Sequence, residues 1–176
     1  MLTSTTPGHG LLFASFLYRR DLFEKQELIS FWENQFGLSF TFEPLGNPLI
    51  DYYAKEMGGV LSRFFVITSK TYSREYLLST KLLSLSWEKD WAHENLRRVN
   101  VDVGFLSLEN FILSTTKNYS HRIYIGQNIF ADLTYVFQNG QFQPLPWTYP
   151  DYLDADKKDF LTWGRFFLLQ NPQNQM

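Results

Sequence analysis

The chain contains no cysteine. This absence excludes disulfide bonds, thiolate metal sites and a cysteine nucleophile. Histidine is rare as well, and the three residues His9, His93 and His121 are too scattered along the sequence to form a zinc site. The sequence also has no Walker loop, Rossmann fingerprint, Gly-x-Ser-x-Gly elbow or His-Glu-x-x-His motif. It therefore specifies neither a metal site nor a cofactor.

An excess of positive charge is missing too. The chain has 16 Lys and Arg against 18 Asp and Glu, which gives a formal net charge of −2. Proteins that bind duplex nucleic acid usually carry a clear basic excess or a basic stripe. We therefore expect no duplex nucleic-acid partner, although a local basic pocket is compatible with this balance.

The apolar run from Leu11 to Tyr18 is too short to cross a bilayer, which takes about 20 residues in a helix. The sequence around it also lacks the charged region and the small-residue cleavage site of a secretory signal. We therefore expect a cytoplasmic protein without a membrane partner.

What the chain has in abundance is aromatic and apolar residues. Hydrophobic residues make up 44% of its 176 residues and charged residues 19%, which is typical of a globular protein. The aromatic content of 18% favours a core built largely from rings, although such rings also stack on the bases of single-stranded nucleic acid. The length fits one domain, which we place at residues 11–170 between flexible ends at 1–10 and 171–176.

Helical periodicity and capping signals predict four helices. The first runs from about Leu22 to Phe36 after an Asp21 cap, and the second runs from Ser73 to about Glu94. A short third helix follows Ser107 to about Thr116, and a last one starts at Asp154 or Asp156. On the second helix the apolar rows leave the following charged side chains facing water: Lys81, Glu88, Lys89 and Asp90.

Apolar runs and alternation predict the strands. They are Leu11 to Tyr18, Leu38 to Phe42, Arg63 to Ser69, Arg98 to Val101, His121 to Ile125, Ile129 to Phe137 and Gln141 to Pro144. The dipeptide Asn139-Gly140 favours a tight turn between the last two strands. The order of elements predicts an α+β fold, with one mostly antiparallel sheet covered by about three to four helices.

The main polar feature is a cluster of basic residues and hydroxyls. Thr116 and Lys117 follow the predicted short helix, and His121 and Arg122 open the next strand. Together they suit a phosphate or a carboxylate, and His121 is the best candidate for proton transfer. The alternative is ordinary, because basic residues near a helix C-terminus also interact favourably with the helix dipole.

Asp132 lies on the partner strand of this cluster, and two hairpin registers are compatible with the sequence. With a three-residue loop at 126–128, Arg122 lies opposite Asp132 and the two can pair. With a two-residue loop at 127–128, Asp132 shares a face with His121 instead.

A second polar group follows Arg98. Asn100 and Asp102 alternate with valines and should project together, and Gly104 allows close approach of the backbone. Asp102 is a candidate base or metal ligand, although capping a loop is the more common role for such a residue. Arg97 and Arg98 point to opposite faces, so only one of them can face a site; we include Arg98 among the candidate ligand-binding residues.

Several separated motifs also occur together in one known family. They are Asp51-Tyr52-Tyr53 with Glu56-Met57-Gly58, Arg98-Val99-Asn100-Val101-Asp102, Gly104-Phe105-Leu106, Ser114-Thr115-Thr116-Lys117, His121-Arg122-Ile123-Tyr124 and Trp147-Thr148-Tyr149-Pro150-Asp151-Tyr152. Through them the chain, from roughly Leu11 to Phe167, resembles domain-of-unknown-function family 4416, an uncharacterised prokaryotic family. The resemblance implies a stand-alone soluble domain without an assigned reaction.

The chain departs from the family pattern at three positions. Val103 stands where the family tends to have Pro, Phe105 where it tends to have Tyr, and Asp132 where Glu is more usual. Phe105 in place of Tyr removes a hydroxyl group that the family usually has. The basic cluster of Lys117, His121 and Arg122 is intact. Some relatives carry a GTP-binding label, which modestly favours a nucleotide or phosphate ligand. The label has little weight for this chain, because the sequence has no Walker loop and no guanine-reading motif.

Two functions from different classes fit these patterns. The first is a pocket for an anionic small molecule, held by Lys117, His121 and Arg122 and oriented by Asn100 and Asp102; if it is catalytic, phosphoryl transfer or hydrolysis is expected. The second is an interaction module that docks a protein partner through the aromatic loops at 52–53 and 147–152. A weaker third interpretation is single-stranded nucleic acid stacked on the same rings.

Overall fold

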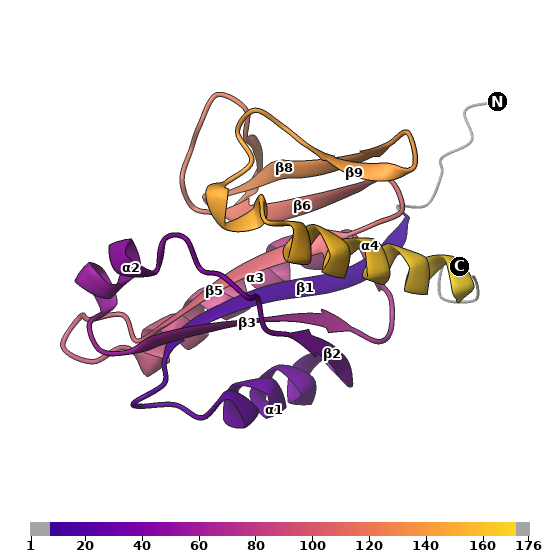
Figure 1. The fold of residues 1–176 in the computed structure, drawn as a ribbon. Helices are drawn as coiled ribbons and strands as arrows, with labels where there is room; N and C mark the ends of the chain where they lie inside the picture. The colour runs from indigo at the N-terminus through magenta and orange to yellow at the C-terminus, as the bar shows by residue number, and fades with distance from the viewer. Residues whose placement is uncertain (1–7, 172–176) are drawn as a thin grey trace.

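The computed structural model describes residues 8–171, which fold around one sheet of nine strands (Figure 1). The strands are β1 (His9–Arg19), β2 (Ser39–Phe42), β3 (Leu61–Thr68), β4 (Tyr72–Ser73), β5 (Val99–Leu106), β6 (Asn110–Thr115), β7 (Ile123–Gly126), β8 (Ile129–Gln138) and β9 (Gln141–Pro144). Their order is β2-β3-β1-β5-β6-β8-β7, with β4 on β1 and β9 on β8. The pairs are antiparallel.

Four α-helices and one 3-10 turn accompany the sheet in this part of the chain. They are α1 (Lys25–Phe36), α2 (Ile50–Met57), α3 (Tyr76–Trp91), α4 (Ala155–Gln170) and η1 (Pro150–Tyr152). The predicted α+β class with a mostly antiparallel sheet is therefore confirmed. None of the helices within residues 8–171 is long and apolar enough to cross a membrane.

The sheet has a hydrophobic core on each face, because successive side chains of the buried strand β1 point to opposite sides. Leu12 and Phe16 pack with Trp32 of α1 and Trp87 of α3. On the other face, Phe13 packs in the cluster that contains residues 160, 161 and 168 of α4. Figure 1 shows α4 lying across one face and α3 behind the other.

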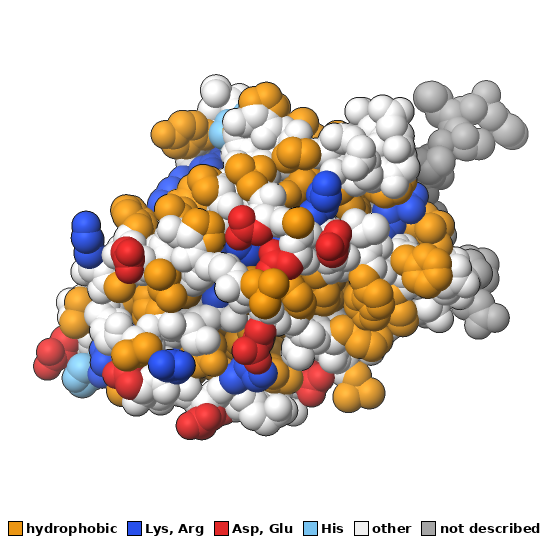
Figure 2. All heavy atoms as spheres, in the orientation of Figure 1, with side chains coloured by type: hydrophobic (Ala, Val, Ile, Leu, Met, Phe, Trp, Pro, Cys, Tyr) orange, Lys and Arg blue, Asp and Glu red, His pale blue; other side chains and the backbone are white. Residues whose placement is uncertain are grey.

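The outer side of α4 is apolar as well. Trp163, Phe166 and Leu169 are each at least 40% exposed. Figure 2 shows hydrophobic side chains gathered over this helix on the visible face. None of the three lines the cavity described below.

Two predicted elements are wrong. The segment after Ser107 forms strand β6 instead of a short helix, because it pairs with β5 on one side and β8 on the other. Ser107 does not cap a helix, since its hydroxyl group bonds with Asn110 in the β5–β6 turn. The aromatic residues 52–53, predicted to lie in a loop, belong to α2, whose Met57 is buried against the end of β1.

Several boundaries also differ from prediction. Helix α1 begins at Lys25, because the Asp21 carboxylate accepts a hydrogen bond from Arg19 (2.6 Å) instead of capping the helix. The first strand begins at His9, and Asn171 follows the last helix. The rest of the two ends predicted to be flexible, 1–7 and 172–176, lies outside the described residues.

Helix α3 presents a different face to the sheet than its leucine rows predict. Its buried residues are Leu77, Thr80, Lys81, Ser84 and Trp87. Lys81 is only 5% exposed, so the prediction that it faces water is wrong. Glu88 is also largely covered, with 12% of its side chain exposed, whereas Lys89 and Asp90 are exposed as predicted.

The feature of the sheet that positions the site is the short pairing between β5 and β6. The two strands pair only from Gly104 to Leu106, and they separate before Gly104. At Gly104 the strands approach so closely that a Cβ atom would lie 2.9 Å from the carbonyl oxygen of Ile112. Strand β5 runs from Val99 to Leu106, so Asp102 lies within the strand and not at its predicted end.

A buried ion pair fixes the segment after β9 to the sheet. The guanidinium of Arg63, on β3, lies 2.8 Å from the carboxylate of Asp151, in η1, and both side chains are 2% exposed. Burial raises the pKa of Asp151, and the charge of Arg63 opposes that rise. The segment from Trp147 to Tyr152 is thereby held in one place beside the open part of β5.

We expect Arg63→Met alone or Asp151→Asn alone to destabilise the protein by about 3–5 kcal/mol, because each leaves a buried charge unpaired. The double variant Arg63→Met/Asp151→Asn should lose clearly less than the sum of the two single variants, because no buried charge is left unpaired in it. Urea unfolding of the four proteins measures this coupling. Additive losses would show that the two side chains do not support each other.

Candidate functional site

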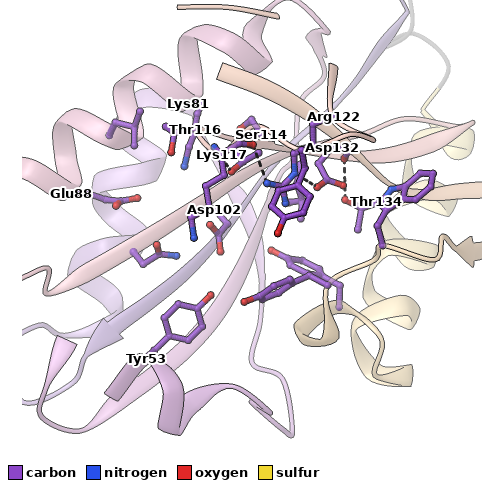
Figure 3. Close-up of a pocket in the computed structure, with 18 of the residues that line it drawn as sticks. Tyr53, Lys81, Glu88, Asp102, Ser114, Thr116, Lys117, Arg122, Asp132 and Thr134 are labelled. Carbon is purple, nitrogen blue, oxygen red and sulfur yellow. Dashed lines mark hydrogen bonds and ion pairs between the residues drawn. The ribbon is translucent and has the colours of Figure 1, made fainter. Parts of the chain in front are cut away.

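A cavity of about 620 Å³ opens where β5 and β6 separate. Its walls come from these two strands, from helices α2 and α3, and from the segment that Asp151 anchors. Figure 3 shows Tyr53 of α2, Asp102 of β5, Lys81 of α3 and Asp132 of β8 directed toward it. Segments distant in sequence thus contribute polar side chains to one concave site, the usual form of a small-molecule site.

The cavity collects almost all of the candidate residues predicted from sequence. Those that line it are Asn100, Asp102, Thr116, Lys117, His121, Arg122 and Asp132. Arg98 does not line the cavity, whereas its neighbour Arg97 does. Arg97 donates hydrogen bonds to Glu56 on α2 and to the side-chain oxygen of Asn100.

His121, Arg122 and Asp132 form one hydrogen-bonded group. The Arg122 Nε donates to Asp132 Oδ2 at 2.7 Å, and His121 Nε2 lies 3.4 Å from the same oxygen. Gln127 and Asn128 form the tight turn of the hairpin, with φ angles of 47° and 60°. A register shift between Tyr124 and Gly126 then restores the alignment of the longer loop. Because of this bulge, the carboxylate contacts both basic side chains, so the two sequence alternatives are both partly realised.

Trp147 lines the cavity beside His121, Arg122 and Asp132. Its ring stacks on the imidazole of His121, with centroids 4.9 Å apart and planes 12° from parallel. The indole Nε1 donates to the carbonyl oxygen of Leu133 at 2.8 Å, which fixes the ring. The orientation of His121 is therefore set by Asp132 on one side and by Trp147 on another.

Lys117 and Asp102 differ from the other charged residues of the cavity. Within residues 8–171, neither the Lys117 ammonium nor the Asp102 carboxylate has a hydrogen-bonding or ion-pair partner among the protein's own side chains and backbone. Lys117 is exposed and Asp102 is half-buried. Figure 3 shows the two side chains reaching toward the same part of the cavity from β5 and from the end of β6. Each is thus available to a ligand.

The inner wall contains a pair of side chains that the sequence analysis missed. The Lys81 ammonium donates to the carbonyl oxygen of Val101 at 3.0 Å, and the Glu88 carboxylate accepts from the amide of the same residue at 2.8 Å. Burial raises the pKa of Glu88, and the charge of Lys81 opposes that rise. The sequence contains an indication that Lys81 and Glu88 are covered, since residues 81, 84 and 88 share one side of a helix with Trp87.

Tyrosines complete the wall opposite the basic cluster. Burial raises the pKa of Tyr53, and the negative charge of Asp102 adds to the rise. The pKa of Tyr152 is raised for the same two reasons. Both phenols therefore stay protonated near neutral pH and can donate hydrogen bonds. Within the described residues, no three His, Asp or Glu side chains are grouped so that they could hold a metal ion.

Comparison with known proteins matches the chain to a family model. No curated protein and no solved structure matches the chain significantly. The model that matches is described as "Domain of unknown function (DUF4416)", and it covers residues 9–166, which include every residue of the cavity. The chain therefore belongs to this family of unknown function.

Proposed function

We propose that this protein binds a small anionic ligand, a nucleotide or another phosphorylated metabolite with a planar ring, in the cavity between β5 and β6. The observation that carries the proposal is the position of Lys117. Its ammonium has no ion-pair partner in the described part of the chain, and it lines the same cavity as Arg122 and His121. Lysine and arginine side chains that converge in this way are typical of phosphate sites.

The ion pairs within the cavity show which of its charged side chains are free to bind an anion. Four Lys or Arg and four carboxylates line it. Arg122 pairs with Asp132, and Arg97 contacts the carboxylates of Glu56 and Glu88. The Arg122–Asp132 pair is neutral and the Arg97 group carries one net negative charge, so these eight side chains are neutral as a whole. The groups that favour an anion are the two lysines without a carboxylate partner, Lys81 and Lys117.

The ring of the ligand is inferred from the aromatic wall. The aromatic residues that line the cavity are Tyr52, Tyr53, Tyr119, Trp147, Tyr149 and Tyr152. Rings of this number around one cavity offer stacking surfaces for a base or a similar planar group. The basic cluster also lines a concave, partly open cavity and is not spread over a flat surface, which supports a small ligand over a docked protein.

The same cavity holds groups suited to proton transfer. Asp102 is a carboxylate without a cationic partner, and His121 is oriented by Asp132 and Trp147. In a hydrolysis, the Asp102 carboxylate would take a proton from water as the water attacks phosphorus, and protonated His121 would donate one to the leaving oxygen. Phosphoryl transfer to water is the reaction that we propose for this site.

Lys117→Ala should abolish ligand-induced stabilisation while leaving the fold intact, because the side chain is exposed and has no protein partner. A ligand at about 100 times its Kd adds roughly 2.7 kcal/mol to the free energy of unfolding, which raises the Tm by several degrees. A thermal-shift panel of nucleotides, sugar phosphates and simple anions measures this. Lys89→Ala, an exposed lysine outside the cavity, is the matched control. Equal shifts in wild type and Lys117→Ala would contradict the proposal.

A nucleoside monophosphate should bind about ten times more tightly than inorganic phosphate, since stacking of one base contributes about 1–3 kcal/mol. Tyr149→Ala, which removes a ring of the cavity that does not stack on His121, should reduce this ratio and leave the affinity for phosphate itself within about twofold. Isothermal titration of the two ligands measures the ratio. A ratio near one in the wild type would exclude a ring-binding wall.

Wild-type protein should release inorganic phosphate from a ligand that the thermal-shift panel identifies. Asp102→Asn should lower the rate by about 100-fold, because general base catalysis contributes typically 10²–10⁴-fold, and binding should be retained. A colorimetric phosphate assay measures the rate. Turnover at the wild-type rate in Asp102→Asn would remove Asp102 from the catalytic role.

A further inference from the structure

The inner wall of the cavity lies at an interruption of the sheet. The register of β5 and β6, in which Gly104 pairs with Leu113, would place Val101 opposite Thr116 if the pairing continued. The strands separate instead, and Val101 bonds with side chains of α3 in place of a neighbouring strand. Lys81 reaches this gap from the α3 side, and it lines the same cavity as Asp102.

Residues from both faces of the sheet meet in this gap. Val101 and Val103 belong to the core between the sheet and α3. Asp102 alternates with them on β5 and therefore projects from the other face. A cavity lined by both Lys81 and Asp102 must extend into the space between the two strands.

Lys81 is unusual because its charge is buried without a direct carboxylate partner. It is 5% exposed, its hydrogen bond is to a neutral carbonyl group, and no carboxylate lies within 4.0 Å of its ammonium in residues 8–171. The chain offers a direct contrast in Lys157, which is 1% exposed but lies 2.6 Å from the carboxylate of Asp154. Burying an ammonium is costly unless it is paired, so a buried lysine that faces a cavity is a candidate for binding an anion.

We propose that the phosphate group of the ligand enters the gap between β5 and β6, where Lys81 binds it from the α3 side and Lys117 binds it from the opposite side. The inference rests on the proposed function and adds to it a second cationic contact and the location of the phosphate. The Lys81 ammonium has three N–H donors, so it can donate to a phosphate oxygen and keep its bond to Val101. The hydroxyl group of Thr116, which also lines the cavity, supplies a further donor.

A substitution at Glu88 offers a second test of the proposal, with an expected effect on anion affinity opposite to that of a substitution at Lys81. Its carboxylate contacts the same residue, Val101, as Lys81 does, so it adds negative charge near the proposed phosphate position. Replacing it by Gln keeps an oxygen that can accept the hydrogen bond of the Val101 amide and removes the charge. Two variants of one helix should therefore change anion affinity in opposite directions, which a purely structural role does not predict.

The test is isothermal titration of the full chain with pyrophosphate and inorganic phosphate as probes. Lys81→Met should weaken binding by about tenfold or more, which is the size expected for loss of a hydrogen bond to a charged group. Glu88→Gln should strengthen binding several-fold, by about threefold or more. Lys89→Met, an exposed lysine of the same helix, should leave the affinity unchanged. Thermal unfolding of each variant without ligand shows whether it is folded.

The outcomes separate this inference from the proposed function. If Lys81→Met and Glu88→Gln lower the Tm but bind like the wild type, Lys81 only supports the open edge of β5 and the inference is overturned. If Lys117→Ala abolishes binding and Lys81→Met does not change it, the proposed function stands without the inner contact. A wild type that binds neither probe nor any nucleotide overturns both. If Lys81→Met does not fold, the increase expected for Glu88→Gln decides the question alone.

Discussion

The structure depends on how the open edge of strand β5 satisfies its backbone hydrogen bonds. Buried N–H and C=O groups without partners are costly, so a strand that loses its neighbour needs other donors and acceptors. Here they come from side chains. Lys81 and Glu88 bond to the two backbone groups of Val101, and the hydroxyl of Ser114 donates to the carbonyl oxygen of Val103 at 2.9 Å. Because these side chains take the place of a neighbouring strand, the sheet can open into a cavity here. Strand β5 remains paired with β1 along its length and with β6 from Gly104 to Leu106.

The hydrophobic pattern predicted the fold well where burial decides the structure. The continuous apolar run at 11–18 and the alternation at 38–42 both became strands, because strands buried on two faces or on one face need those patterns. Residues 110–115 show the limit of this method. Their local sequence is compatible with a helix, and only pairing with β5 and β8, which are brought together by the rest of the fold, makes them a strand.

The candidate site was predictable to the extent that charged residues are close in sequence. Lys117, His121 and Arg122 lie within six positions, and a hairpin brings Asp132 to them. Lys81 was not predictable in this way, because its burial depends on which side of α3 faces the sheet. The row of Leu78, Leu82 and Leu85 indicates one side of the helix, whereas the buried residues Leu77, Lys81 and Ser84 lie on another. The choice between Arg97 and Arg98 likewise depends on α2, whose Glu56 holds the first of them.

The anchored segment from Trp147 to Tyr152 has a consequence for the thermodynamics and the rate of the binding proposed above. Asp151 is fixed to β3, the hydroxyl of Tyr135 donates to the backbone carbonyl of Tyr152, and Trp147 bonds to β8. Three attachments within six residues restrict this wall of the cavity already, so little conformational freedom would be lost on ligand binding. Preorganised walls of this kind reduce the entropic cost of association, and encounter does not have to wait for a loop to close. Under the proposed function, selectivity would arise from the shape that is already present, and a ligand whose ring is too large for the cavity would be rejected at entry.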